Sequence, residues 1–542
     1  MTPATAARYW HTLRHLKLGQ VTGRLRMRLL RPSLDSRAAA LASRARTGDW
    51  VTPPARQASM TGPDSFRFLN HDATAPGWND PAQEKLWLYN LHYFDDLNAQ
   101  GAAQRGDWHR DLLARWIAQN PPTAGTGWEP YPTSLRIVNW VKWALAGNLM
   151  PTTVQASLAL QARWLMQRLE WHLLGNHLFA NAKALVLAGL FLEGAEAKTW
   201  LAKGLAIVAR QLPEQVLSDG GNFERSPMYH AIFLEDVLDL INAAQAFGQV
   251  PAATVHGWRE TAIRMLDFMA GLTHPDGGIA LFNDAAFGIA PTPHDLADYA
   301  ARLGIVAPCG SDRLRHWSDS GYIRLENDAA VALLDVAPVG PDYLPGHAHA
   351  DTLSFELSLR GRRVIVNGGT SRYGADAERQ RERATAWHST VEVAGADSSE
   401  VWGGFRVARR AYPFDLKKHS ENNILEVDCS HDGYCRLPGR PVHRRVWRLS
   451  PGSLTVRDHV SGGAPALARF ILHPGLALHA DGAVWRILDG DALVATATVT
   501  QGQGNVRDAQ YAPEFGQRFA TRCLAVALTK GQSAVTFDWS MA

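Results

Sequence analysis

The sequence predicts a multidomain α+β protein in which a helical region precedes an antiparallel β-sandwich, and three observations support this. The chain has 542 residues, too many for one ordinary hydrophobic core. Between about residues 107 and 303, apolar residues recur at intervals of three and four, which is typical of amphipathic helices. After about residue 313 the sequence changes to short runs of β-forming residues bounded by turns.

Five long helices can be placed by this periodicity and by the Gly, Pro or Asp residues between them. Helices of similar length joined by short loops are typical of a helical bundle or of an α/α toroid, and the pattern alone does not separate the two. The five predicted helices are residues 153–174, 177–193, 197–212, 230–247 and 255–272.

The second half of the chain is predicted to form strands, with turn signals at intervals that favour an antiparallel sandwich. We expect a lead-in at residues 1–75, a helical domain at 76–306 and a β-sandwich at 313–542, with residues 307–312 as the linker. The predicted strands are residues 321–325, 330–336, 352–359, 363–366, 423–427, 453–456, 483–488, 492–497 and 524–528.

The composition indicates a globular protein and argues against several functions. Hydrophobic residues make up 46% and charged residues 20%, and the net charge of +3 is too small to indicate a nucleic-acid partner. The four cysteines form no CxxC pair, and no segment has the roughly 18 consecutive apolar residues of a transmembrane helix. The first residues lack the apolar core of a secretory signal, so the sequence by itself indicates a cytoplasmic protein.

The N-terminus is basic, with no acidic residue before Asp35. Leucines are interleaved with the cations at roughly helical spacing. We expect an amphipathic helix packed on the protein with a solvated basic face, and the alternative is weak contact with an anionic membrane surface or polymer. The basic residues are Arg8, Arg14, Lys17, Arg24, Arg26, Arg28 and Arg31.

The most informative motif is the run from Gly346 to Asp351, which carries His347 and His349 two residues apart. On an extended segment, side chains at this spacing point to the same face. Such imidazoles can bind a metal or act as a base. Each of them alone can equally be a satisfied polar residue of the core.

Three further motifs carry side chains of the same chemical kind. Asn176 and His177 occupy a break between two predicted helices, where an amide can bind a carboxylate or, as spacing alone favours, cap a helix. Tyr229 and His230 follow an irregular stretch that contains Glu224; a phenol there can be a buried core group or a proton donor. Together these motifs suggest chemistry at a carbon acid next to a carboxylate.

A metal site is also suggested, because His347, His349 and His388 with Asn367 make a plausible set of ligands. Arginines that suit carboxylates or sulfates lie nearby in the sequence, although a solvated loop would have the same composition. No P-loop, GxSxG or HExxH motif is present, which argues against nucleotide-binding, serine-hydrolase and zincin functions. The arginines are Arg372, Arg379, Arg381, Arg383, Arg406 and Arg409.

In order and spacing these motifs resemble those of the heparinase II/III-like polysaccharide lyases, and in particular the heparinase III branch. The resemblance runs from about residue 66 to beyond residue 445 and identifies a family, not a substrate. The segments that carry it are residues 86–97, 127–136, 175–177, 226–230, 346–351 and 388–391.

The resemblance implies an incomplete (α/α) toroid followed by an antiparallel sandwich, with the cleft between them. It implies lytic β-elimination of an anionic, uronate-containing polysaccharide, such as a glycosaminoglycan or a bacterial exopolysaccharide or capsule. By motif position, Asn176 and His177 would neutralise the uronate carboxylate. Tyr229 would be the acid, and the base for one C5 configuration, while His347 would be the base for the other.

The resemblance also places His349, Asn367 and His388 where metal-binding relatives hold a divalent cation (Zn, Ca or Mn). Because Asn367 stands where such relatives carry Asp, and a neutral amide is the poorer ligand, occupancy by a cation is in question. The family would also make the periplasm the alternative location. The expected substrate contacts are Trp128, Arg136, Glu224, His230, Trp402 and Arg406.

Two other functions stay open at this point. A uronyl C5-epimerase removes the same proton and returns it to the opposite face without expelling O4. A non-catalytic glycan-binding protein could use the same fold, although the presence of Asn176, Tyr229 and His347 together argues against it.

Overall fold

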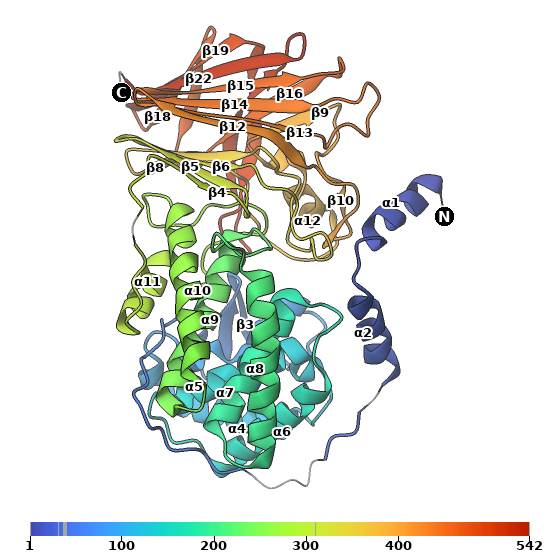
Figure 1. Ribbon diagram of the computed structural model, residues 1–542, viewed down its shortest axis with the longest axis vertical. Coiled ribbons are helices and arrows are strands. Elements are labelled where there is room, and N and C mark those ends of the chain that lie inside the picture. The colour runs from blue at the N-terminus through green and yellow to red at the C-terminus, as the bar shows by residue number, and fades with distance from the viewer. Residues whose placement is uncertain (1, 31, 36–40, 309, 541–542) are drawn as a thin grey trace.

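The structure, a computed structural model, describes residues 2–30, 32–35, 41–308 and 310–540. A helical region is followed by two antiparallel sheets stacked above it (Figure 1), which confirms the predicted fold class. The last helix before the junction is α11 (Pro293–Arg302), and the first strand after it is β4 (Leu314–Trp317). The domain boundaries given above stay predictions. Among the described helices, none combines the length and the apolar character needed to cross a membrane.

The helical region is built around α7 (Gly175–Phe191), whose side chains are buried on nearly all sides. Small residues permit this, because a side chain at Gly189 would lie 2.6 Å from the carbonyl oxygen of Ala197 on the next helix. The surrounding helices are α3 (Lys85–Tyr93), α4 (Gly106–Gln119), α5 (Pro130–Leu145), α6 (Thr152–Gln167), α8 (Ala195–Gln215), α9 (Pro227–Phe247) and α10 (Ala252–Gly271).

Within the described residues, the upper sheet of Figure 1 has eight strands and the lower one nine. In the eight-stranded sheet the order is β12 (Pro413–Glu421), β13 (Ile424–His431), β14 (His443–Ser450), β15 (Ser453–Val460), β22 (Gln532–Asp538), β19 (Ala492–Gln501), β18 (Val484–Asp489) and β17 (Ala477–Asp481). In the other it is β20 (Gln503–Tyr511), β21 (Phe519–Ala527), β16 (Ala466–Leu472), β8 (Arg362–Val366), β7 (Phe355–Leu359), β6 (Ala330–Asp335), β5 (Tyr322–Glu326) and β4, with β9 (Val391–Val393) beside β16.

Both faces of the nine-stranded sheet are buried. One packs against the eight-stranded sheet and the other against the helical region, so this sheet connects the two regions. Alternate residues such as Leu334 and Phe355 pack in the sandwich core with Trp447 of the opposite sheet. The residues between them point to the other face of the sheet, where Leu333 packs against Phe268 of α10. Because both faces are covered, β6 and β7 are buried along their whole length.

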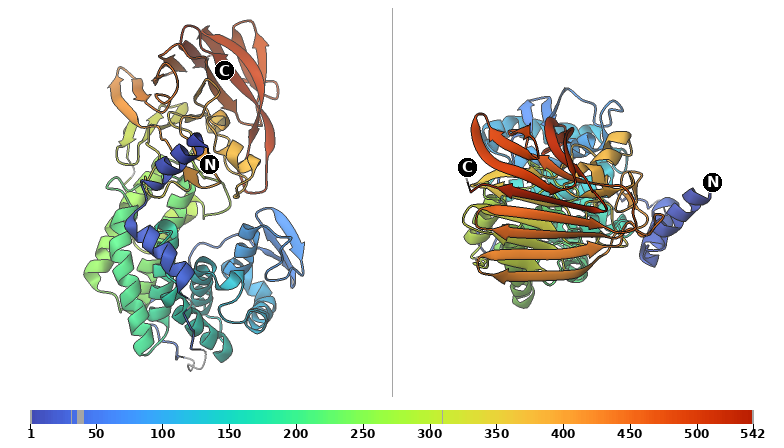
Figure 2. Two further views of the ribbon diagram at one scale, coloured as in Figure 1. Left: turned by 90° about the vertical axis from the view of Figure 1, so that its right-hand side faces the viewer. Right: turned by 90° about the horizontal axis from the view of Figure 1, so that it is seen from above.

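The lead-in contains both helices and strands. Helices α1 (Pro3–Leu13) and α2 (Leu18–Leu29) lie beside the junction of the two regions (Figure 2), and a small sheet follows. That sheet consists of β1 (Met60–Gly62), β2 (Ser65–Phe68) and β3 (His71–Thr74). The helices do not bury their apolar residues as expected, since most large apolar side chains on them are exposed. Arg31 lies outside the described residues.

The segment from Gly346 to Ser354 is not the extended strand that the sequence suggested. It consists of turns and irregular backbone, and β7 begins only at Phe355. The backbone N–H of His349 donates to the side-chain oxygen of Asn283 (2.9 Å), so a loop of the helical region holds this segment. A contact between distant parts of the chain therefore replaces the strand ladder here.

Candidate active site

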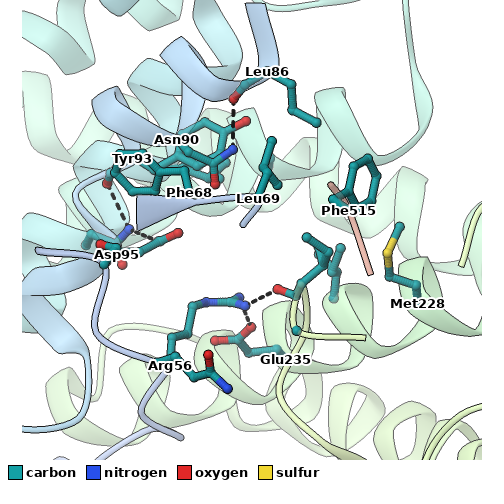
Figure 3. Close-up of a pocket in the computed structure, with 18 of the residues that line it drawn as sticks. Arg56, Phe68, Leu69, Leu86, Asn90, Tyr93, Asp95, Met228, Glu235 and Phe515 are labelled. Atoms are coloured by element: carbon teal, nitrogen blue, oxygen red, sulfur yellow. Dashed lines mark hydrogen bonds and ion pairs between the residues drawn. The ribbon is translucent and has the colours of Figure 1, made fainter. Parts of the chain in front are cut away.

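The predicted motifs meet where the ends of the helices face the loops below the sandwich. A cavity of about 300 Å³ opens beside Tyr229 and runs into the helical region (Figure 3). Phe68 and Leu69 of the lead-in, Met228 of α9 and Phe515 of the loop after β20 line it. Three separate parts of the sequence thus build one pocket.

Asn176 and His177 occupy the first turn of α7. The chain enters this helix through Leu174 and Gly175, both with positive φ, and a side chain at Gly175 would lie 2.4 Å from Leu344. The positive φ favours glycine at this position. The amide of Asn176 makes no cap and no other hydrogen bond to the described residues, so the capping interpretation fails.

His177 is held by a carboxylate. Its Nδ1 lies 3.1 Å from Oε1 of Glu170, whose other oxygen accepts a hydrogen bond from Asn181 (3.0 Å). Burial disfavours the charged imidazole, but the charge of Glu170 outweighs this and raises the pKa of His177. The imidazolium form is thereby favoured, and a cation beside the free Asn176 amide suits an anionic ligand.

Tyr229 lies in the first turn of α9, where Ser226 caps the helix and accepts a hydrogen bond from the backbone N–H of Tyr229 (3.2 Å). The Tyr229 ring stacks on the imidazole of His347, with centroids 3.8 Å apart. Its hydroxyl lies 2.9 Å from that of Tyr373. Burial, and then the proximity of the second phenol, raise the pKa of Tyr229 well above 10, so it holds its proton.

Asp284 organises the base. It is fully buried, and its Oδ2 accepts from Nδ1 of His347 (2.9 Å) while its Oδ1 accepts from Nε2 of His349 (2.8 Å). Arg379 donates to both oxygens, to Oδ2 at 2.6 Å. Burial opposes ionisation, but Arg379 and the two histidines outweigh it and hold the pKa of Asp284 well below its ordinary value. The carboxylate fixes the His347 tautomer and leaves Nε2 as the acceptor.

Glu224 completes the surroundings of His347. One of its oxygens accepts from the backbone N–H of Asn176 (3.4 Å), and the other lies 3.5 Å from Nε2 of His347 without a hydrogen-bond partner among the described residues. Burial raises the pKa of Glu224. Glu224 faces the ring nitrogen of His347 that Asp284 leaves as the acceptor.

Two protein-family models match this chain. The heparinase II/III N-terminus model matches residues 108–294, and the heparinase II/III-like C-terminal model matches residues 310–540. The chain belongs to the heparinase II/III-like family. The two matched segments cover the helical region and the sandwich, and the site described above lies between them.

Individual members of the heparinase II/III-like family are distant from this chain. A heparin-sulfate lyase of Bacteroides stercoris is 26% identical over 241 residues, 40% of this chain and 35% of that protein. One from Pedobacter heparinus is 24% identical over 244 residues, 40% of this chain and 36% of that protein. The matched segments thus span about a third of these relatives.

Solved structures show the same fold at low identity. A crystal structure of heparinase III has a TM-score of 0.69 at 19% identity, over 85% of this chain and 78% of that one. A mutant heparan sulfate lyase from Pedobacter heparinus has a TM-score of 0.61 at 16% identity, over 96% and 87% of the two chains.

The three residues expected to hold a cation do not together fit one. The carboxamide oxygen of Asn367 accepts from the backbone N–H of Ser389 (3.1 Å), and Nδ1 of His349 lies 3.2 Å from Nε2 of His388. Within the described ranges, no group of three or more His, Cys, Asp or Glu side chains could hold a metal ion. Burial lowers the pKa of His349 to about 4 and holds the pKa of His388 well below its ordinary value, so the two imidazoles form a neutral, hydrogen-bonded pair. A bound cation stays a prediction.

Three expected substrate contacts are buried elsewhere. The Trp128 ring is tilted against that of Trp116 in the helical core, with centroids 5.8 Å apart. Arg136 is enclosed there, donating to Gln161 (2.9 Å) and lying over the Trp116 ring. His230 is buried on α9, with Nε2 2.9 Å from the carbonyl oxygen of Met265 on α10. In the structure these three side chains stabilise the helical region and do not line the pocket, and their contact with a substrate stays a prediction.

The other two expected contacts face the N-terminus. The Trp402 indole donates to Thr12 of α1 (3.1 Å) and packs edge-on against Tyr9. The guanidinium of Arg406 lies 4.8 Å from the centre of the Trp402 ring. Both residues belong to the short hairpin of β10 (Val401–Trp402) and β11 (Arg406–Val407), and Trp402 serves to hold α1.

The sequence motifs did not identify Asp284 or Tyr373 as site residues, and they did not indicate the role of Arg379. No periodicity or spacing marks Asp284 or Tyr373, since each lies in an irregular loop. Arg379 stood among many arginines of one segment. The many arginines of that segment indicated an anion-binding region. The sequence did not distinguish the arginine that pairs with Asp284 from the others.

Proposed function

We propose that this protein is a polysaccharide lyase that cleaves a uronate-containing polymer by β-elimination. The observation that carries the proposal is the stacked pair of Tyr229 and His347, with His347 oriented by Asp284, beside the unpaired amide of Asn176. These four side chains supply what abstraction of a proton next to a carboxylate requires: neutralisation of the carboxylate, a base and an acid.

Neutralisation falls to Asn176 and His177. Removing the C5 proton of a uronate places a second negative charge on the carboxylate group as an enolate-like dianion. An amide and an imidazolium fixed in advance at the carboxylate offset that charge, and one such donor contributes about 3–4 kcal/mol at comparable sites. Their neighbouring positions in one helical turn suit a single carboxylate.

Proton transfer falls to His347 and Tyr229. Nδ1 of His347 donates to Asp284, so Nε2 takes the C5 proton. Tyr229, whose pKa is raised, donates its proton to O4 as the C4–O4 bond breaks, and Tyr373 lies in place to stabilise the phenolate that forms. The products are a 4,5-unsaturated uronate and a free hydroxyl end.

Stacking of the two rings favours elimination over epimerisation. A uronyl C5-epimerase needs a proton donor and a proton acceptor on opposite faces of C5, whereas the rings of Tyr229 and His347 are stacked with centroids 3.8 Å apart. Two proton transfers on the same side of the sugar ring suit an elimination, in which the C5 proton is removed and the adjacent O4 is protonated. The epimerase is therefore the second candidate, and simple glycan binding the third.

The pocket favours a polymer with few or no sulfate groups. The lysines and arginines that line it are each paired with a carboxylate: Arg56 with Glu235 (2.6 Å, Figure 3), Lys142 and Lys183 with Asp239 (2.5 Å each), and the exposed Arg67 with Asp72 (2.7 Å). A sulfate there would have to compete with these carboxylates and be desolvated without a free cation. We therefore propose a non-sulfated uronate polymer, such as a bacterial capsule or exopolysaccharide.

The test combines two measurements on one set of polymers: heparosan, heparan sulfate, alginate and polyglucuronate. Ultraviolet absorbance from unsaturated ends that is lost in Tyr229→Phe supports the lyase, and a higher rate on heparosan than on heparan sulfate supports the substrate class. Absence of absorbance, with deuterium entering C5 from heavy water, would support the epimerase instead. Binding of a polymer without either reaction would support a glycan-binding protein.

A further inference from the structure

The helices α1 and α2 expose an unusual amount of apolar surface. Trp10 is 65% exposed, Leu18 77% and Leu29 75%, whereas water-soluble surfaces seldom gather such side chains in one place. The large apolar residues exposed on this pair of helices and just after it are Tyr9, Trp10, Leu13, Leu18, Val21, Leu25, Leu29 and Leu30.

On α2 these residues form one line, here called the apolar stripe: Leu18, Val21, Leu25 and Leu29. Their spacing of three, four and four residues places them on one face of a helix. An apolar stripe of this kind normally packs against the rest of its own protein. Because this stripe is exposed, another molecule is needed to cover it.

The opposite face of α2 is the one that packs on the protein. Gln20 and Gly23 are buried, and Gln20 donates to the carbonyl oxygen of Tyr343 (3.1 Å). A side chain at Gly23 would lie 2.9 Å from the backbone nitrogen of His172, so the contact there is close. The apolar stripe consequently points away from the body, and Figure 2 shows α2 lying along the outside of the molecule.

Basic residues border the apolar stripe on both sides. At 100° per residue, Lys17, Arg24 and Arg28 lie on one flank and Arg26 on the other. In the described part of the chain no ion pair joins Arg24, Arg26 or Arg28 to an acidic side chain, and no acidic residue precedes Asp35. The occupant must therefore be anionic at its surface and apolar just beneath.

We propose that α1 and α2 dock this protein on the surface of an anionic lipid bilayer. Leu18, Val21, Leu25 and Leu29 would enter the boundary between head groups and acyl chains, and the flanking arginines would bind lipid phosphates. An anionic polysaccharide offers the charge but no apolar layer for the stripe. This inference rests on the helix pair alone and is independent of the proposed lyase reaction.

Co-sedimentation of the full chain with vesicles tests the proposal. We expect binding to vesicles that contain phosphatidylglycerol, none to vesicles of phosphatidylcholine alone, and weakening by salt. The triple variant Arg24→Gln, Arg26→Gln, Arg28→Gln should bind about a hundredfold more weakly, since each basic side chain near an anionic surface changes affinity about fivefold.

A matched pair of variants isolates the apolar stripe. The variant Leu18→Ser with Leu29→Ser should lose vesicle binding while keeping its circular dichroism spectrum. Its control replaces two equally exposed apolar residues far from the helices, Leu149→Ser (89% exposed) and Val306→Ser (75% exposed), and should bind as the wild type does.

Three results would overturn the proposal. Vesicle binding that is absent, or that is the same in stripe and control variants, would do so. A wild type that forms dimers and a stripe variant that is monomeric, with no vesicle binding, would assign the stripe to a contact between copies. Loss of polymer binding in the arginine variant, with vesicle binding unchanged, would assign the cations to the polysaccharide.

Discussion

Replacement of Asp284 by asparagine separates the catalytic role of this carboxylate from its structural one. Asp284 accepts hydrogen bonds from Arg379 and from both His347 and His349 inside the protein. The asparagine keeps the shape but removes the charge, leaving the buried guanidinium of Arg379 unpaired and the tautomer of His347 undetermined.

The size of both effects follows from these contacts. Removing one partner of a buried ion pair destabilises a protein by about 3–5 kcal/mol, against a total stability of about 5–15 kcal/mol, so Asp284→Asn should still fold. In serine proteases, neutralising the carboxylate that orients the catalytic imidazole lowers kcat about 10⁴-fold. We expect a loss of about 10²–10⁴ in kcat here.

The sandwich core provides a matched control. Asp458 is as buried as Asp284 and accepts hydrogen bonds from Arg445 (2.7 Å) and His443 (2.8 Å), but it lies away from the pocket. Thermal melts followed by circular dichroism should show a similar loss of stability in Asp284→Asn and Asp458→Asn. Formation of unsaturated ends should be lost in Asp284→Asn alone. Equal kcat in the two folded variants would refute the role given to Asp284.

Four further predictions follow from the same contacts. Asn176→Ala should lower kcat about 10²–10³-fold through loss of one preorganised donor, whereas the surface variant Asn148→Ala should not; a folded Asn176→Ala with wild-type kcat contradicts the carboxylate role. Tyr373→Phe should lower kcat about tenfold at unchanged KM, the contribution of one hydrogen bond to Tyr229, and an altered KM with normal kcat would place Tyr373 in substrate binding instead. Burial, and then the charge of Asp284, raise the pKa of Asp351 to about 6, while burial, and then the charge of Asp351, hold the pKa of Asp335 well above its ordinary value. Because these folded-state pKa values exceed the unfolded value of about 3.9, the contribution of the pair to stability is complete below that pH and is lost as the pH rises through 6. Melting temperatures should therefore fall over this range in the wild type and less in Asp351→Asn, and parallel curves would count against the pair. Dialysis against EDTA should leave kcat unchanged, because the histidine pair lacks an anionic third ligand; activity that is lost and then restored by zinc would reverse this.

Most of the fold could be predicted because its helices and strands bury one regular face. The predicted helix 230–247 corresponds to α9, and 255–272 to α10, within three residues at each end. The predicted helix 153–174 was too long, since α6 ends at Gln167. Beyond it the backbone N–H of Glu170 donates to the side chain of Asn181 (2.8 Å), a contact with the next helix that periodicity does not reveal.

The site was predictable only where a motif marked it. Asn176, His177, Tyr229 and His347 come together as their motifs indicated, and Glu224 joins them. A motif does not distinguish a residue that faces the pocket from one that supports it, and Trp128 and Arg136, which lie in such a motif, are buried in the helical core.

Asp284 and Tyr373 show the opposite limit. Their partners are distant in the chain: Asp284 binds Arg379 from 95 residues away, and Tyr373 meets Tyr229 across 144 residues. Contacts of this range depend on how the two regions pack on each other. They leave no local pattern in the sequence.

The most direct test of the central claim is the ultraviolet absorbance of the wild-type protein and of Tyr229→Phe, each incubated with heparosan and with polyglucuronate. The account predicts unsaturated ends from at least one polymer with the wild type and a loss of at least a hundredfold with the variant, at an unchanged circular dichroism spectrum. Unsaturated ends formed equally fast by a folded Tyr229→Phe would contradict the assignment of Tyr229 as the acid and, with it, the proposed reaction at this site.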